Sequence, residues 1–276
     1  AAYLFLVSSA MAYEQAPALM DLRTTFSDGA YDPETLVQMA VKKGFRVIFL
    51  NDHDRVAMEY GLPPFRNIIK KREEMNSINK SGANRYLRTI EGLRKMYPNV
   101  ILIPGTESAP FYYWTGSPFA GNLTANDHER RILTMGLEKT GDYESLPVLH
   151  NRLSGTGLRA VMPALAALLL SFLISIYFVF NNGWWRISGV VLIILNAGFF
   201  LNTVFAHPSP FDAYHGKQGV APYQLFIAAV SRKGGLTFWN YPETRSGVRK
   251  LGPIQVKTLP YPGVLLETIN YTGFAA

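Results

Sequence analysis

The sequence predicts an α/β fold that is interrupted by a pair of membrane-spanning helices. Two observations predict it: helices alternate with short apolar strands, and two long apolar runs lie next to each other in the middle of the chain. A third observation concerns chemistry, because polar residues cluster directly after the predicted strands. Alternating helices and strands are typical of a parallel sheet or barrel, in which active sites lie at the carboxyl ends of the strands.

The alternation begins with a helix that starts at Pro33 and a strand over 46–50. Asp32 caps this helix, Pro33 occupies its first position and Gly44 ends it. The further elements that the pattern predicts are a basic helix over 64–96, a strand over 100–103, a helix over 223–232 and a strand over 236–239. We therefore expect parallel strands that are joined by helices.

Residues 158–206 are predicted to form a transmembrane helical hairpin. Each of its two apolar runs has about 20 residues or more, enough to cross a hydrocarbon core of roughly 30 Å. Trp184 and Trp185 in the turn suit the headgroup interface. Asn196 and Asn202 would be costly against lipid, so we expect them to face the first helix or a partner chain. The alternative is a buried helical hairpin in a soluble protein.

A hairpin returns the chain to the side from which it came, so residues 21–157 and 207–276 would share one compartment and form one domain. Residues 1–20 form an N-terminal apolar segment, interpreted as a retained anchor or an uncleaved signal-like segment; a buried strand is the alternative. Basic residues flanking the hairpin favour a cytoplasmic domain, whereas the signal-like start favours the opposite side. We expect the bacterial inner membrane, with an extracytoplasmic globular domain.

Composition excludes several classes of function. The chain has 276 residues and no cysteine, which excludes disulfide scaffolds, thiolate metal sites and cysteine nucleophiles. Only 17% of the residues are charged and 48% are hydrophobic, a balance that favours a membrane segment. The net charge of +7 suits anionic lipid headgroups, but no basic run is longer than Lys70-Lys71-Arg72, so nucleic acid is not an expected partner.

The polar clusters that follow the predicted strands form the candidate site. They are Asp21 and Asp28 near the start, Asn51-Asp52-His53-Asp54, Thr106-Glu107, and Asn240-Tyr241-Pro242-Glu243. Because each cluster ends a different strand, we expect them to converge. The other histidines, which we interpret as surface or hydrogen-bonded residues, are His128, His150, His207 and His215. The aromatic run 111–114 is predicted to cover a core or to dock on lipid or a partner.

These clusters lie in segments that resemble the PHP (polymerase and histidinol phosphatase) metallohydrolase family. Residues 21–54, DLRTTFSDGAYDPETLVQMAVKKGFRVIFLNDHD, look like the opening of that domain. PGTES at 104–108 is similar to its third motif, and GGLTFWNYPE at 234–243 is similar to the strand that ends in AHPE. The resemblance implies a distorted (βα)7-type PHP-like barrel with the hairpin as an insertion, several divalent metals and phosphoester hydrolysis.

The chain departs from the family pattern at its metal ligands. The family's two histidines in the first motif correspond to Arg23 and Thr25, and the histidine of the AHPE motif corresponds to Tyr241. The residues that still match positions at or near the family's metals are Asp28, Asp52, His53, Asp54 and Glu107. A guanidinium repels a dication strongly at close range. We therefore expect no cofactor, and an ion pair from Arg23 to Asp52, Asp28 or Glu107.

Two functions are compatible with this pattern. The first is a non-catalytic, membrane-anchored PHP-like pseudoenzyme that serves as an accessory subunit of a larger integral-membrane complex, possible examples being respiratory or photosynthetic ones. It would bind other membrane subunits, and lipids, through 158–206. The alternative is a membrane-tethered phosphoesterase with a reduced site, in which Asp28, His53, Asp54 and Glu107 hold a divalent Zn, Mn or Fe ion that activates water.

Overall fold

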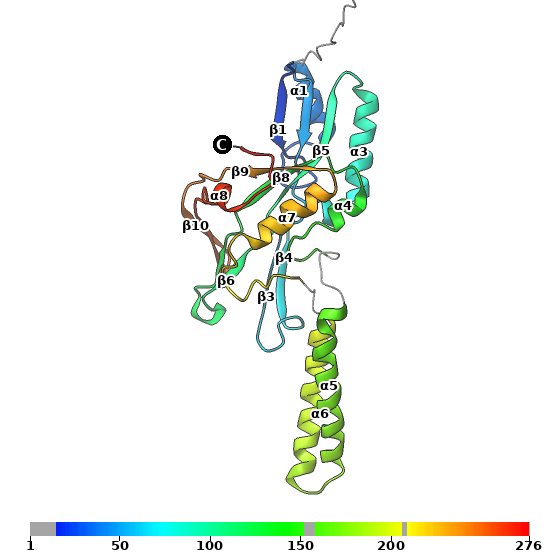
Figure 1. Ribbon diagram of the computed structural model, residues 1–276, viewed down its shortest axis with the longest axis vertical. Coiled ribbons are helices and arrows are strands. Elements are labelled where there is room, and N and C mark those ends of the chain that lie inside the picture. Colours follow the sequence, from blue (N-terminus) through cyan, green and yellow to red (C-terminus); the bar gives the residue numbers. More distant parts are fainter. Residues whose placement is uncertain (1–14, 152–157, 206–208, 276) are drawn as a thin grey trace, which may run out of the picture.

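A six-stranded sheet carries the core of the domain, and two long helices project from one end (Figure 1). The computed structural model describes residues 15–151, 158–205 and 209–275. The sheet order is β1-β2-β5-β8-β9-β12. The bounds of these strands are Ala18–Leu22, Val47–Leu50, Ile101–Ser108, Arg131–Met135, Leu236–Asn240 and Gly273–Ala275. Most of the predicted N-terminal segment 1–20 lies outside the described residues, and its last three residues begin β1.

The main sheet is mixed, which corrects the predicted parallel sheet. β1, β2 and β5 run parallel, and so do β9 and β12, but β8 is antiparallel to both of its neighbours. The chain returns from β5 to β8 through two short strands and not through a crossover helix, so β8 enters the sheet in the opposite direction. Within the described residues the sheet curls but does not close into a (βα)7-type barrel.

Helices pack on this sheet and complete the core. Their bounds are α1 Pro33–Lys42, α2 Ile78–Ser81, α3 Ala83–Met96, α4 Thr140–Glu144, α7 Ala221–Arg232 and α8 Val264–Glu267, with the 3-10 helix η1 at Pro118–Ala120. The predicted cap of α1 is confirmed, since the Asp32 carboxylate accepts the N–H of Thr35 at 3.0 Å. Tyr86 of α3 is fully buried, and its hydroxyl donates to the carbonyls of Leu50 and Gly105.

Two smaller sheets extend from the core. One has the order β10-β11-β7-β6, with bounds Gly247–Leu251, Ile254–Thr258, Thr124–Asn126 and Tyr113–Thr115. The other is the hairpin of β3 (Ala57–Gly61) and β4 (Lys70–Glu74). The aromatic run 111–114 belongs to the core, because Phe111, Tyr112 and Trp114 are buried.

The β3–β4 hairpin corrects the first half of the basic helix predicted over 64–96. Side chains alternate along both strands: Glu59 is buried on the inner face and pairs with Lys70 at 3.0 Å, whereas Met58 and Tyr60 point the other way. This period of two residues is that of a strand. The Pro63-Pro64 pair in the turn also disfavours a helix, because proline lacks an N–H and restricts the residue before it.

The projecting pair consists of α5 (Leu158–Val179) and α6 (Trp184–Val204), which lie side by side (Figure 1). Both are long and apolar enough to cross a membrane. Only 6% and 11% of their apolar windows are buried, unlike the core helix of a soluble protein. Asn196 donates to Ser175 of α5 at 3.0 Å, which confirms its predicted orientation toward the first helix.

Asn202 has a different partner from the one predicted. Its side-chain oxygen accepts the N–H of Asn67 at 2.8 Å, and its carbonyl accepts the Asn67 side chain at 2.9 Å. Beside this pair, the rings of Phe65 and Phe199 lie 5.1 Å apart. The turn of the β3–β4 hairpin therefore packs on α6, which connects one edge of the globular body to the apolar helix pair.

We expect Asn202→Ala to accelerate amide hydrogen exchange of the turn 62–69 about fivefold, because losing one hydrogen bond costs about 1 kcal/mol. Exchange would be measured by mass spectrometry on the full chain in detergent. The matched control is Asn181→Ala at the far turn, where the side chain donates to the carbonyl of Tyr177. Equal acceleration by both variants would show that α6 does not hold the turn.

Candidate functional site

Polar residues from four strand ends meet at one edge of the main sheet. Asn240, at the end of β9, donates to Glu107 of β5 at 2.7 Å and to Asp21 of β1 at 3.4 Å. Asn51, directly after β2, accepts the N–H of Asp21 at 3.2 Å and donates to the carbonyl of Thr134 at 3.1 Å. These contacts bring together the clusters that the sequence placed at separate strand ends.

Glu107 lies at the centre of this edge, with only 3% of its side chain exposed. Its Oε1 accepts from Asn240, whereas its Oε2 is 2.9 Å from Arg131, 3.1 Å from His53 and 3.7 Å from Arg23. Burial alone would raise the pKa of the carboxyl, but His53 and the charges of Arg131 and Arg23 outweigh it and lower the pKa to about 2. Glu107 is therefore an anion whose two oxygens both have donors.

Arg131 is the residue of this cluster that the sequence analysis missed. It contacts Glu107 and Glu129, each at 2.9 Å, and lies 3.4 Å from the His53 ring. Arg131 begins β8, and because β8 is antiparallel, its start lies at the edge where the neighbouring strands end. A search of carboxyl strand ends alone could not find it. Arg131 could have been found by assigning a strand to residues 131–135, RILTM, and by recognising that this strand runs in the reverse direction.

Arg23 and Asp28 lie in the loop after β1, on the open side of the cluster. Arg23 pairs with Asp28 at 3.2 Å and approaches Glu107, so two of its three predicted partners are present. His53 contacts Asp28 at 3.4 Å. Thr25 is exposed and is absent from the lining of the cleft at this site, whereas Tyr241 lines that cleft and is half exposed.

Asp52 and Asp54 do not line the cleft. Asp52 is buried and accepts hydrogen bonds from the backbone and hydroxyl of Thr24 at 2.7 and 2.8 Å and from the hydroxyl of Ser27 at 2.6 Å. It therefore holds the loop after β1 in place. Asp54 is fully buried, and loss of solvation raises the pKa of its carboxyl to about 6, against weaker opposing effects of the Arg55 backbone and Ser108.

The residues present do not fit a metal centre. Among the described residues, no group of three or more His, Asp or Glu side chains is arranged to hold a metal ion. His53 contacts both Asp28 and Glu107, but the Glu107 oxygen that faces His53 also faces the guanidinium of Arg131. A dication bound there would lie against a permanent positive charge, which is electrostatically unfavourable.

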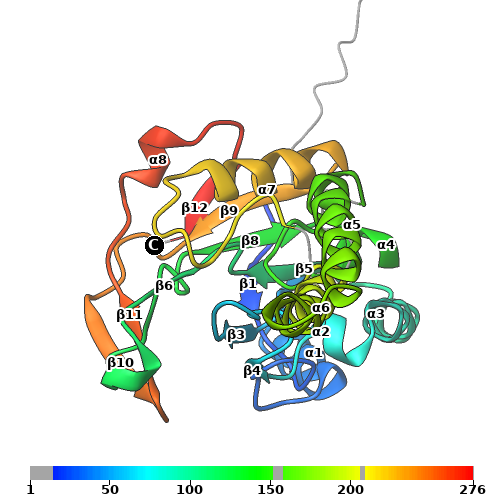
Figure 2. The ribbon, with the colours of Figure 1, turned by 90° about the horizontal axis from the view of Figure 1, so that it is seen from below.

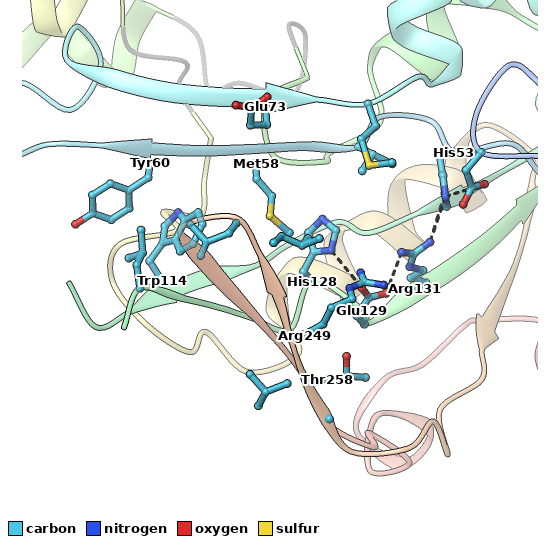
Figure 3. Close-up of a pocket in the computed structure, with 18 of the residues that line it drawn as sticks. His53, Met58, Tyr60, Glu73, Trp114, His128, Glu129, Arg131, Arg249 and Thr258 are labelled. Atoms are coloured by element: carbon cyan, nitrogen blue, oxygen red, sulfur yellow. Dashed lines mark hydrogen bonds and ion pairs between the residues drawn. The ribbon is translucent and has the colours of Figure 1, made fainter. Parts of the chain in front are cut away.

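The cluster forms one end of a cleft of about 1080 Å³. The β3–β4 hairpin forms one wall of the cleft and β10–β11 forms the other, as Figure 3 shows for Met58 and Tyr60 above and Arg249 and Thr258 below. His128 also lines the cleft. It was interpreted as a residue of a polar loop, but it is 6% exposed, and burial lowers the pKa of its ring. Its packing against the Tyr112 ring, which no sequence pattern indicates, accounts for the burial.

The remaining histidines fit the earlier interpretation where the structure describes them. His150 lies 2.8 Å from the Tyr112 hydroxyl, and His215 is exposed and pairs with Asp212 at 2.8 Å. His207 lies outside the described residues.

Comparison with known proteins gives a weak likeness to a solved structure. No family model matches the chain, and no curated protein matches it. Among solved structures, the chain is similar to a protein from Bifidobacterium adolescentis that is provisionally described as a metal-dependent phosphoesterase. The two share 17% sequence identity with a TM-score of 0.36, over 92% of this chain and 74% of that chain. A likeness at this level says nothing about the chemistry of the site.

Proposed function

We propose that this chain is a non-catalytic, membrane-anchored domain that serves as an accessory subunit of a larger integral-membrane assembly. The observation that carries the non-catalytic part is the contact of Arg131 with Glu107 at 2.9 Å, deep in the cleft. The carboxylate of Glu107, at the centre of the cluster, is neutralised by guanidinium groups and also accepts a hydrogen bond from the Asn240 amide, so it has no free oxygen for a metal or for proton transfer.

The anchoring part of the proposal is supported by α5 and α6. Their apolar faces are exposed, and a soluble protein rarely exposes so large a continuous apolar surface. Asn196 and Asn202 each make a side-chain hydrogen bond within the chain, which lowers the cost of surrounding the pair with lipid. The same exposed faces can pack against helices of partner subunits.

The first test is purification of the full chain from membranes in a mild detergent, with metal analysis and identification of the co-purifying chains in one sample. We expect stoichiometric partner chains and a metal content far below one ion per chain. Arg23→His/Thr25→His, which restores the residue types of the family motif, is the matched comparison for metal content. One tightly bound transition metal ion per unmodified chain, with no partner, would contradict the proposal.

The second candidate is a membrane-tethered phosphoesterase with a reduced site. It is favoured by the position of Asp28 and His53, which are in contact and line the open cleft. Metal-dependent hydrolysis of p-nitrophenyl phosphate, lost in both Asp28→Asn and His53→Gln, would establish it. Asp54 offers little to this candidate, because its side chain does not line the cleft.

A further inference from the structure

The wall of the cleft formed by β3–β4 is a largely apolar face that leads from the charged cluster toward α6. Met58 is paired with Glu73 across the hairpin, and Tyr60 with Lys71, which puts these four residues on one face. The flanking residues that also line the cleft are Val56, Leu62, Ile69 and Met75. The two charged members pair with each other at 3.3 Å, so the face carries little net charge.

The opposite wall is also apolar and open to solvent. Val248 and Leu251 of β10 line the cleft with 59% and 44% exposed surface, and on the β3–β4 side Ile69 and Met75 line it with 51% and 60% exposed surface. Exposed apolar side chains on both walls of a cleft mark a binding groove for an apolar group. A cleft of about 1080 Å³ is at the upper end of sites for small molecules, so an extended ligand fits.

The lining of the cleft favours an anion at its polar end. Six Lys or Arg residues line it against four Asp or Glu residues, a surplus of two positive charges. Arg245 is exposed and has no ion pair with any described residue, whereas Arg249 pairs with Glu129 at 3.1 Å. An anionic group can therefore approach Arg245 without first breaking an ion pair.

The β3–β4 wall of the cleft is also in contact with the helix pair. Seen from the side of α5 and α6, β3–β4 and β10–β11 lie on either side of it, with α6 next to β3–β4 (Figure 2). The turn between β3 and β4 contacts α6 through Phe65–Phe199 and Asn67–Asn202. If α5 and α6 cross a bilayer, the apolar face of β3–β4 begins near the surface of the bilayer. It ends near Arg245 and Arg249.

We propose that this cleft binds a membrane lipid with an anionic headgroup. Its acyl chains lie along the face of β3–β4 opposite Val248 and Leu251, and its phosphate lies at the end lined by Arg245 and Arg249. The proposal depends on the membrane anchoring in the proposed function but not on the absence of catalysis. A soluble phosphate ligand would leave the apolar walls without a role.

The test is native mass spectrometry of the full chain released from detergent, titrated with dioctanoyl phosphatidic acid, with dioctanoylglycerol or with inorganic phosphate. We expect phosphatidic acid to bind most tightly. Met75→Glu should weaken its binding about tenfold, since it places a carboxylate against the acyl chains. Arg245→Gln should weaken phosphatidic acid binding about fivefold and leave dioctanoylglycerol unaffected.

Two control variants match these changes outside the cleft. Met96→Glu changes a methionine that is 55% exposed, close to the 60% of Met75, and Arg88→Gln removes an exposed arginine from α3. Both should leave phosphatidic acid binding unchanged. Equal losses in Met75→Glu and Met96→Glu would overturn the proposal, since the lipid would then bind elsewhere.

Other outcomes also decide the question. If inorganic phosphate competes as well as phosphatidic acid, the site takes a free anion and the lipid proposal is wrong. If no lipid binds and Met75→Glu instead releases a co-purifying chain, the cleft holds a partner's segment and the lipid proposal is again wrong. Neither outcome changes the metal content, so failure of the lipid proposal is distinguishable from failure of the non-catalytic one.

Discussion

Arg131→Met should lower the free energy of unfolding by about 3–5 kcal/mol, the largest loss we expect from any single change at the site. The variant leaves Glu107 buried and ionised without its closest cation, which is at 2.9 Å. The measurement is the thermal unfolding midpoint of the full chain in detergent at pH 7. The matched control is Lys95→Met, whose pair with Glu91 is mostly exposed and should contribute about 0–1 kcal/mol.

The stability that is lost in Arg131→Met should depend on the presence of the Glu107 carboxylate and on pH. Adding Glu107→Gln to Arg131→Met should recover most of the stability, because the remaining amide can still accept from Asn240. The carboxyl of Glu107 has a folded pKa of about 2, below its usual 4.5. Its contribution is therefore fully present above pH 4.5 and disappears as the pH falls through about 2, where the variant and the unmodified chain should converge. Additive effects in the double variant would contradict the assigned ion pair.

Asp54→Asn should stabilise the domain at pH 7–8 by about 2–3 kcal/mol, the expected size for relieving a buried carboxylate whose pKa is about 6 and not 3.8. A carboxyl with a raised folded pKa contributes its stability below the unfolded value of 3.8, and this contribution is lost as the pH rises through about 6. Through this group, the thermal unfolding midpoint of the unmodified chain should therefore decrease as the pH is raised from 4 to 6. In Asp54→Asn the midpoint should depend less steeply on pH over this range.

The control for Asp54→Asn is Asp32→Asn, because the pKa of the Asp32 carboxyl is shifted in the opposite direction. Hydrogen bonds from the backbone and side chain of Thr35 lower the pKa of the Asp32 carboxyl, so its contribution is lost as the pH falls below 3.8. Asp32→Asn should weaken the cap of α1 and leave the slope between pH 4 and pH 6 unchanged. A destabilised Asp54→Asn that also loses a bound metal would instead favour the phosphoesterase.

Local sequence patterns determined the elements whose signals do not depend on distant residues. Asp32 and Pro33 start α1 because capping acts within a single turn of helix. The lengths of α5 and α6 follow from two uninterrupted apolar runs, and the strands 47–50 and 236–240 follow from short apolar segments. The meeting of Asp21, Asn51, Glu107 and Asn240 was also predictable, since β1, β2, β5 and β9 run in the same direction and their carboxyl ends lie at one edge of the sheet.

Tertiary structure alone decided which charged side chains pair with one another. Arg131 reaches Glu107 because β8 runs antiparallel, and strand direction depends on how the chain returns from β5 and not on the residues of β8. Residues 57–74 form a hairpin although their charges suit a helix, because Glu59 finds Lys70 across the strands and the turn packs on α6. Asp54 follows His53 directly, yet one side chain is enclosed and the other lines the cleft, because neighbouring side chains after a strand point in opposite directions. Residue types and spacing therefore predicted where polar groups gather, and the strand directions decided which charges neutralise one another.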